Sequence, residues 1–267
     1  IDDKDLEILD RIEALSPAPG PSDPLPIEQM YHGSRLAPKG ATHVHHLFFP
    51  RARHALHALW KRTSKIRDRR LRSFMFFAVE QAIWGMSLLN RYSPTHYSQV
   101  NRYLSGVCYI SSNIAEVAPW YILEGKIKRL ARAFARMDYQ TGSVAVATQS
   151  ATDTLAPENS VDYVFVDPPF GENIYYADLN YLEYTWHRVW TDSDPEAIVD
   201  QAKNKDLFDY QDLMRESFAQ FYGCLKPGHW MTVEFHNSHN AVWNAIQEAL
   251  LAAGFVVADV RVLDKKS

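Results

Sequence analysis

The stretch VDYVFVDPPF, residues 161–170, decides the fold of this chain, because an apolar run typical of a strand leads directly into Asp167-Pro168-Pro169-Phe170. Proline fixes φ and has no backbone N–H, so this loop cannot continue as a helix or as a strand ladder. Each proline also holds the residue before it in an extended conformation. The sequence therefore predicts a stiff turn at the carboxyl end of a strand, where open α/β sheets bind their ligands.

This turn gathers hydrogen-bond acceptors and an aromatic ring in one small volume. Asp167 contributes a carboxylate, the prolines contribute carbonyls without N–H donors, and Phe170 contributes a flat ring. Acceptors beside a stacking surface suit the exposed amino group of a nucleobase. The alternative is a surface Pro-Pro turn whose Asp caps a helix, and four residues alone do not decide between the two interpretations.

The segments around the turn alternate between strand and helix patterns, which predicts the α/β class. In chain order they are a strand and a loop within 143–155, the strand 161–166, a helix within 171–190, a helix from 207, a break at Leu225–Gly228, a strand from Trp230 to Phe235, and a helix, an Ala-Gly stop and a strand within 241–263.

From about Ser143 to Leu263, the motif and the order and spacing of the elements resemble putative DNA methylases of large bacterial and archaeal proteins. Their signature DPPF-G-x-N-I-x-Y-x-x-L-N is matched at 167–180. These are S-adenosyl-L-methionine-dependent amino methyltransferases of DNA, which carry D/N/S-P-P-Y/F. The resemblance implies a partial Rossmann-like methyltransferase sheet with a mainly helical N-terminal or insertion region.

The family assigns a role to each residue of the turn. Its Asp side chain and first proline carbonyl accept hydrogen bonds from the target amine, which raises the electron density on that nitrogen for in-line attack on the methyl group. Its aromatic residue stacks on a base flipped out of the helix. The resemblance thus implies catalytic roles for Asp167, Pro168, Pro169 and Phe170, with adenine favoured over cytosine as the target.

Further candidates flank the turn. In the family the loop that ends the 143–155 segment lies against the cofactor's adenine, so the resemblance implies that Asp153, with Asp167, binds the cofactor; the alternative for Asp153 is an ordinary turn. Candidate substrate-binding residues are Asn173, Tyr175 and Tyr176 within the signature, and His236 and Asn237 beyond the strand that ends at Phe235. A simple strand-end turn is the alternative for the last two.

One expected feature is missing. Such methyltransferases need a glycine-rich turn after their first strand, where the backbone comes close to the cofactor because glycine has no Cβ. The upstream glycines are each isolated: Gly20, Gly33, Gly40, Gly85, Gly106, Gly125 and Gly142. We therefore expect an interior portion of a larger protein, with the glycine turn encoded upstream. The less favoured interpretation is a degenerate domain that has lost cofactor binding.

Composition excludes several classes. No apolar run approaches the roughly 18–20 residues that span a bilayer, so we expect a cytoplasmic protein without membrane contact. Cys108 and Cys224 form no CxxC pair, which gives no sign of a disulfide framework or a zinc site. The formal net charge is −4, so any contact with DNA depends on local basic patches rather than on the global field.

Two basic stretches are present. The first, predicted on a helix and its following turn, consists of Arg51, Arg53, Lys61, Arg62, Lys65, Arg67, Arg69, Arg70 and Arg72. Arg51 and Arg53 are candidate DNA contacts, since phosphate contacts give affinity without sequence readout. The second stretch consists of Lys126, Lys128, Arg129, Arg132 and Arg136 on a helix that begins at Pro119. A solvated helix face is the alternative for both.

The pattern divides the chain into three parts. Residues 1–40 hold one short helix, Lys4–Leu15, and a Pro-rich linker expected to connect rather than pack. Residues 41–140 are mainly helical, and residues 141–267 form the catalytic half of a methyltransferase domain. Histidines His43, His45 and His46 lack the further ligands of a usual metal site, so no metal is expected.

The function expected from these patterns is S-adenosyl-L-methionine-dependent methylation of the exocyclic amine of a DNA base, with a restriction or defence protein as a candidate partner. Two alternatives remain open. One is an RNA guanine amino methyltransferase, which uses a similar Pro-Pro motif. The other is a non-catalytic DNA-binding module derived from a methyltransferase.

Overall fold

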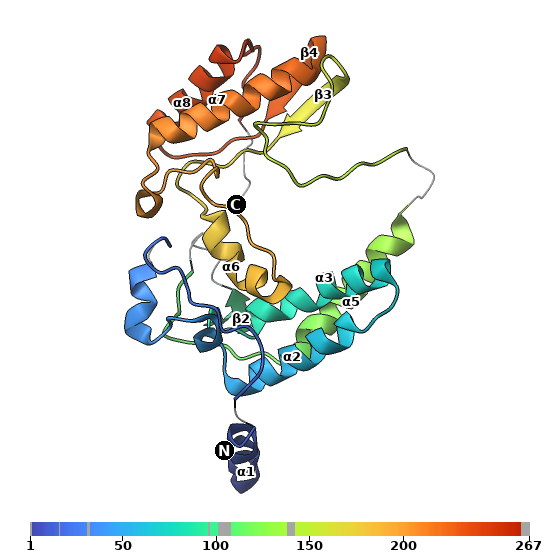
Figure 1. Cartoon of the computed structure of the whole chain (residues 1–267), viewed down its shortest axis with the longest axis vertical. Coiled ribbons are helices and arrows are strands. Elements are labelled where there is room, and N and C mark those ends of the chain that lie inside the picture. Colours follow the sequence, from blue (N-terminus) through green and yellow to red (C-terminus); the bar gives the residue numbers. More distant parts are fainter. Residues whose placement is uncertain are drawn as a thin grey trace. The chain divides into compact units, whose positions relative to one another are not determined.

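The computed structural model describes residues 2–15, 17–30, 33–95, 97–100, 108–137 and 142–262, in which helices are combined with short strands. This mixture agrees with the expected α/β class. The chain divides into two compact units (Figure 1). Unit 1 comprises Ile1–Gly142 with Tyr175–Thr191, and unit 2 comprises Ser143–Ile174 with Asp192–Ser267. The units therefore do not follow the three consecutive parts expected from composition.

Unit 1 is largely helical, and its helices begin where the sequence supplies a cap or a proline. An Asp2–Asp5 capping box starts α1, Asp68 caps α3 by accepting the Leu71 N–H at 2.7 Å, and a proline opens α2 and α5. The elements are α1 (Asp3–Glu13), η1 (Gly33–Arg35), η2 (Ala37–Lys39), η3 (Val44–Leu47), α2 (Pro50–Ser64), α3 (Arg69–Gly85), β1 (Asn90–Ser93), β2 (Tyr97–Val100), α5 (Pro119–Arg136) and α6 (Tyr176–His187).

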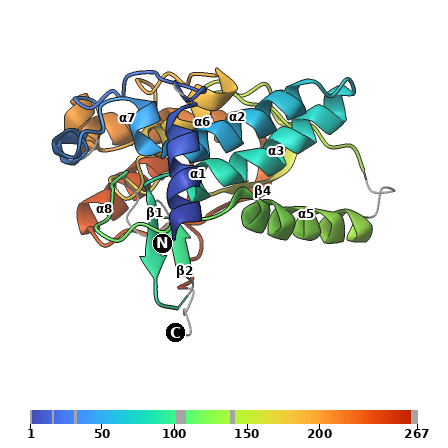
Figure 2. The ribbon, with the colours of Figure 1, turned by 90° about the horizontal axis from the view of Figure 1, so that it is seen from below.

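Helix α3 is the centre of unit 1. It lies between α2 and α5 (Figure 2), and it also contacts α6. The Trp186 ring of α6 lies 5.5 Å from the Trp60 ring of α2 and 6.4 Å from the Phe48 ring, and large rings that pack together bury much apolar surface. Helix α6 therefore belongs to unit 1, although it follows the Asp-Pro-Pro-Phe turn closely in sequence.

One expectation for unit 1 was wrong. The Pro-rich segment packs instead of serving only as a linker: Leu25 and Met30 are buried, and the Pro24 carbonyl accepts the Tyr181 hydroxyl at 2.7 Å. The mainly helical region also contains a strand pair, because β1 and β2 form an antiparallel hairpin.

Unit 2 is a small layer of helices on a parallel two-stranded sheet. Its elements are β3 (Val161–Val166), η4 (Gln201–Lys203), α7 (Leu207–Cys224), β4 (Leu225–Val233) and α8 (Asn240–Ala252). Figure 1 shows α7 and α8 side by side next to the strands. Their core consists of Tyr210, Met214, Phe218, Val242, Ile246, Ala249 and Leu250.

The two faces of the β3–β4 sheet differ. Val166, Met231 and Val233 pack against the core, while Tyr163, Phe165 and Trp230 point the other way and are 53–65% exposed. Three strand expectations need correction. Residues 143–150 and 255–262 form no strand, and β4 already begins at Leu225, so that Leu225–Gly228 lies inside it and not before it.

Candidate functional site

The Asp167–Phe170 turn leaves the sheet at the carboxyl end of β3, as the sequence predicted. The last ladder contact before it is the hydrogen bond from Glu234 N–H to the Val166 carbonyl, at 2.9 Å. Because β3 and β4 are parallel, the segment after Val166 and the segment after Val233 emerge at the same edge. This edge collects most of the predicted site residues.

Two side chains fix the second half of the turn. The Tyr210 hydroxyl of α7 donates to the Pro169 carbonyl at 2.6 Å, and the Asn237 amide donates to the Phe170 carbonyl at 2.7 Å. Burial raises the pKa of the Tyr210 hydroxyl above its ordinary value, because the charged phenolate is disfavoured away from water. Tyr210 therefore remains a hydrogen-bond donor at neutral pH.

Asn237 is itself held on two sides. Its side-chain oxygen accepts the His239 N–H at 2.7 Å, and its backbone carbonyl accepts the Trp243 indole N–H at 2.9 Å. Sequence patterns placed Asn237 in the base pocket. In the structure its amide is buried and supports the turn by donating to the Phe170 carbonyl.

The first half of the turn is left unengaged. Within the described part of the chain, the Asp167 carboxylate and the Pro168 carbonyl have no hydrogen-bond partner, and Asp167 is exposed while Pro168 is buried. The turn therefore presents one exposed acceptor, the Asp167 carboxylate, next to a second acceptor without a partner, the carbonyl of the buried Pro168.

The Phe170 ring is half-buried beside this pair of acceptors. It contacts Phe235 edge to face, with ring centroids 5.4 Å apart, and Phe235 contacts Trp243 in the same way at 4.9 Å. The chain then turns at Gly171, whose φ is +71°. A β-carbon there would lie 3.1 Å from Val242 Cγ1, so the tight contact and the positive φ together favour glycine at this position.

The remaining predicted residues of unit 2 lie around this edge or apart from it. The Asn173 amide donates to the His236 carbonyl at 3.5 Å, and both side chains are exposed. Asp153 lies in an exposed turn, where its N–H donates to the Ser150 carbonyl at 3.3 Å and its carboxylate makes no hydrogen bond or ion pair with the described residues. The structure thus joins Asn173 and His236 to the turn and gives Asp153 no link to it.

The other four predicted residues belong to unit 1. Tyr175 is buried and Tyr176 is exposed at the start of α6. Arg51 is engaged by Glu116 through two hydrogen bonds, which raise the pKa of its guanidinium. The Nε atom of Arg53 is buried without a partner in the described residues, and burial lowers the pKa of this side chain. Neither arginine offers a freely exposed cation.

Sequence reasoning missed Tyr210 and Trp243. Each lies on the apolar face of a predicted helix, where an aromatic residue normally indicates core packing. Nothing in their spacing shows that the Tyr210 hydroxyl reaches a carbonyl 41 residues earlier.

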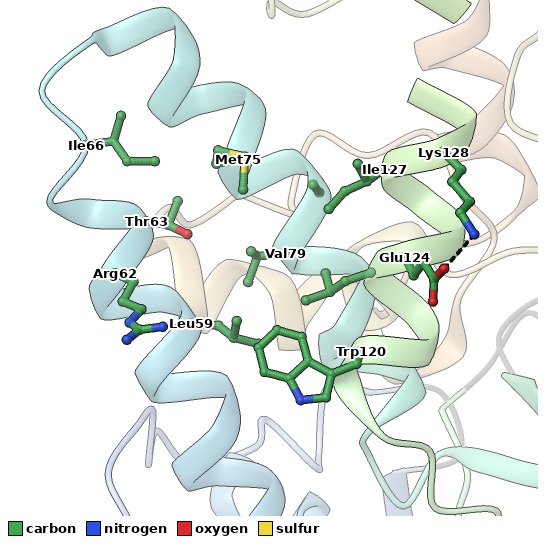
Figure 3. Close-up of a pocket in the computed structure, with 12 residues that line it drawn as sticks. Leu59, Arg62, Thr63, Ile66, Met75, Val79, Trp120, Glu124, Ile127 and Lys128 are labelled. Carbon is green, nitrogen blue, oxygen red and sulfur yellow. Dashed lines mark hydrogen bonds and ion pairs between the residues drawn. The ribbon is translucent and has the colours of Figure 1, made fainter. Parts of the chain in front are cut away.

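Unit 1 also contains a cluster of histidines and an apolar groove, which are features that can bind metals or ligands. The rings of His43, His45 and His46 lie 4.1–5.5 Å apart, but the described residues contain no group of three or more His, Cys, Asp or Glu that could hold a metal ion. An apolar groove of about 650 Å³ lies between α2, α3 and α5 (Figure 3). Among its walls are Leu59, Val79 and Trp120, and it contains none of the predicted site residues.

Comparison with known proteins found no match to any protein family, curated protein or solved structure. Among the described residues, no helix is long and apolar enough to cross a membrane.

Proposed function

We propose that unit 2 holds the exocyclic amine of a nucleobase for methylation by S-adenosyl-L-methionine, with adenine in DNA as the favoured substrate. The observation that carries this proposal is that only the second half of the turn is hydrogen-bonded within the protein. The Pro169 and Phe170 carbonyls are occupied by Tyr210 and Asn237, whereas the Asp167 carboxylate and the Pro168 carbonyl have no partner among the described residues.

The chemistry of an amine matches two such acceptors. An exocyclic amine has two N–H donors, and acceptance of both by Asp167 and Pro168 withdraws the nitrogen lone pair from the ring and raises its nucleophilicity. The charge of the carboxylate strengthens its hydrogen bond. The half-buried Phe170 ring offers a stacking surface for a base taken out of its helix. Because the amine itself is the nucleophile, no covalent enzyme intermediate is needed.

We infer that the methyl donor is not held by a glycine-rich turn of the described residues. The glycine at the turn, Gly171, lies against Val242 and Asn237, and β-carbons at Gly142, Gly223 or Gly228 would meet open space. These glycines are isolated from one another and do not form the glycine-rich turn that such methyltransferases need. The part in the reaction that we assign to this chain is to hold and orient the base.

Methyl transfer by the natural protein that contains residues 1–267 tests the proposal. Asp167→Ala removes one acceptor from an exposed loop and is expected to lower the transfer of labelled methyl groups to DNA by about 100-fold or more, with the fold intact. The matched control is Asp162→Ala on β3, whose exposed carboxylate pairs with Lys226 at 2.6 Å. Retained activity in Asp167→Ala rules out the assigned role.

The same assay separates the two alternatives. Methyl transfer to RNA but not to DNA would favour the guanine amino methyltransferase, since two acceptors also suit that amine. Failure of the natural protein to bind the cofactor would leave a non-catalytic module. For residues 1–267 alone we expect weak or no cofactor binding by calorimetry, and tight binding would contradict our interpretation of the glycines.

A further inference from the structure

The two basic stretches of the sequence meet at one end of the α2–α3–α5 layer. Helices α3 and α5 are antiparallel: a β-carbon at Gly85 would collide with the Ile122 side chain at one end, and the Phe74 and Phe134 rings lie 4.8 Å apart at the other. The start of α3 therefore lies beside the end of α5. Since α2 leads into α3 through only four residues, the end of α2 reaches the same place.

Nine exposed cations gather on these three helix ends and on the α2–α3 connection, and we call this surface the basic end. Its members are Lys61, Arg62, Lys65, Arg67, Arg69, Arg70, Arg129, Arg132 and Arg136. In the described part of the structure none of them has an ion-pair partner. The acid among them, Asp68, uses its side chain to cap α3.

Elsewhere among the described residues, several cations are paired with acids. Arg51 pairs with Glu116, Arg188 with Asp23 and Lys226 with Asp162. A concentration of unpaired positive charge therefore contrasts with a formal net charge of −4 for the whole chain. It also opposes helix stability, because Arg69 and Arg70 stand in the first turn of α3, where the helix dipole disfavours cations.

We propose that the basic end binds the sugar–phosphate backbone of a nucleic acid. Seven of its nine cations are arginines, whose planar guanidinium groups pair with phosphate oxygens in a bidentate manner. Arg129, Arg132 and Arg136 share the face of α5 opposite Phe134 and the rest of its packing stripe, whereas the other six surround the α2–α3 connection. A polymer can follow cations that point in different directions, but a flat lipid bilayer engages one face at a time.

The choice of nucleic acid as the polyanion rests on the proposed function, but the binding itself requires no methyl donor. The test is therefore made without cofactor, by fluorescence anisotropy of residues 1–267 with a labelled DNA duplex of mixed sequence. Reversal of charge in R67E/R69E/R70E, or in R129E/R132E/R136E, is expected to weaken binding at least about ten-fold at about 50 mM salt. The slope of log K against log salt should become shallower by about one for each phosphate that the variant no longer binds.

The matched control is R11E/R215E/R261E, three exposed arginines on α1, on α7 and after α8, which changes the net charge by the same amount. This control should bind within about two-fold of the parent protein. The melting temperature shows whether a variant is folded. R67E/R69E/R70E places acids in the first turn of α3, so we expect its melting temperature to stay the same or rise while its affinity for DNA falls.

Three results would refute the assignment. The first is unchanged DNA affinity in both basic-end variants, and the second is an equal loss of DNA affinity in the control variant. The third is binding of the protein to phosphatidylserine vesicles but not to the DNA duplex. Methyl transfer that fails while salt-dependent DNA binding persists would count against the proposed function and not against the basic end.

Discussion

Tyr210 is the side chain through which helix α7 holds the Asp-Pro-Pro-Phe turn. Its hydroxyl is buried and donates to the Pro169 carbonyl, so Tyr210→Phe leaves that carbonyl without its donor. We expect a loss of about 1–2 kcal/mol in the free energy of unfolding, measured by urea denaturation of residues 1–267. Tyr222→Phe on the same helix is the control, since Tyr222 is 51% exposed and should change little.

The raised pKa of Tyr210 adds a pH dependence to this prediction. Folding favours the protonated phenol, so its contribution to stability is complete below the ordinary tyrosine pKa of about 10 and is lost as pH rises through the folded value. Tyr210→Phe should therefore lose less stability than the parent protein between neutral and strongly alkaline pH. Equal losses would show that Tyr210 does not resist ionisation.

At this scale the sequence predicted the turn but not the side chains that hold it. The position of Asp167 and Pro168 after a strand followed from the local pattern of apolar residues and prolines. The support by Tyr210 and Asn237 depends on contacts across 41 and 67 residues, and a sequence pattern contains no information on such distances.

The β3–β4 sheet has one covered face and one uncovered face, which gives adjacent residues of β4 opposite roles. Met231 packs on the core of α7 and α8, whereas Trp230 is 65% exposed. Met231→Ala should lower the free energy of unfolding by about 2 kcal/mol. Trp230→Ala should change it by less than about 0.5 kcal/mol, although it removes the larger side chain. A greater loss from Trp230→Ala, by the same urea titration, would mean that this face is buried.

Elements were predicted well where their stabilisation is local. Helices α2, α5 and α7 follow from apolar spacing and from their caps or N-terminal prolines. The strands expected at 143–150 and 255–262 do not form, although Val146 and Val262 are each 92% exposed in apolar stretches that suit a strand. A strand needs a neighbouring strand to satisfy its backbone hydrogen-bonding groups. The sequence of the strand itself does not show whether such a neighbour is present.

The division into units also depends on contacts that are remote in sequence. Helix α6 follows the turn of unit 2, yet its Trp186 and His187 pack in unit 1, where the His187 Nε2 atom lies 3.0 Å from Glu80 Oε2. Unit 1 is therefore discontinuous, and its fold is completed by residues encoded after the first segment of unit 2. Composition along the chain predicts consecutive parts, because it does not show that a later segment such as α6 packs with an earlier unit.

This discontinuity predicts how the whole molecule responds to a cut. Residues 143–149 are exposed and have no backbone hydrogen bond to the other described residues, so elastase should cleave there first. The C-terminal piece would then carry α6, which packs against α3 in the N-terminal piece. We expect the two pieces to migrate together in gel filtration and to separate only in denaturant. In Trp186→Ala, which removes the ring between Phe48 and Trp60, the cut pieces should separate more readily. Immediate separation of the cut parent protein would show that α6 does not hold unit 1 together.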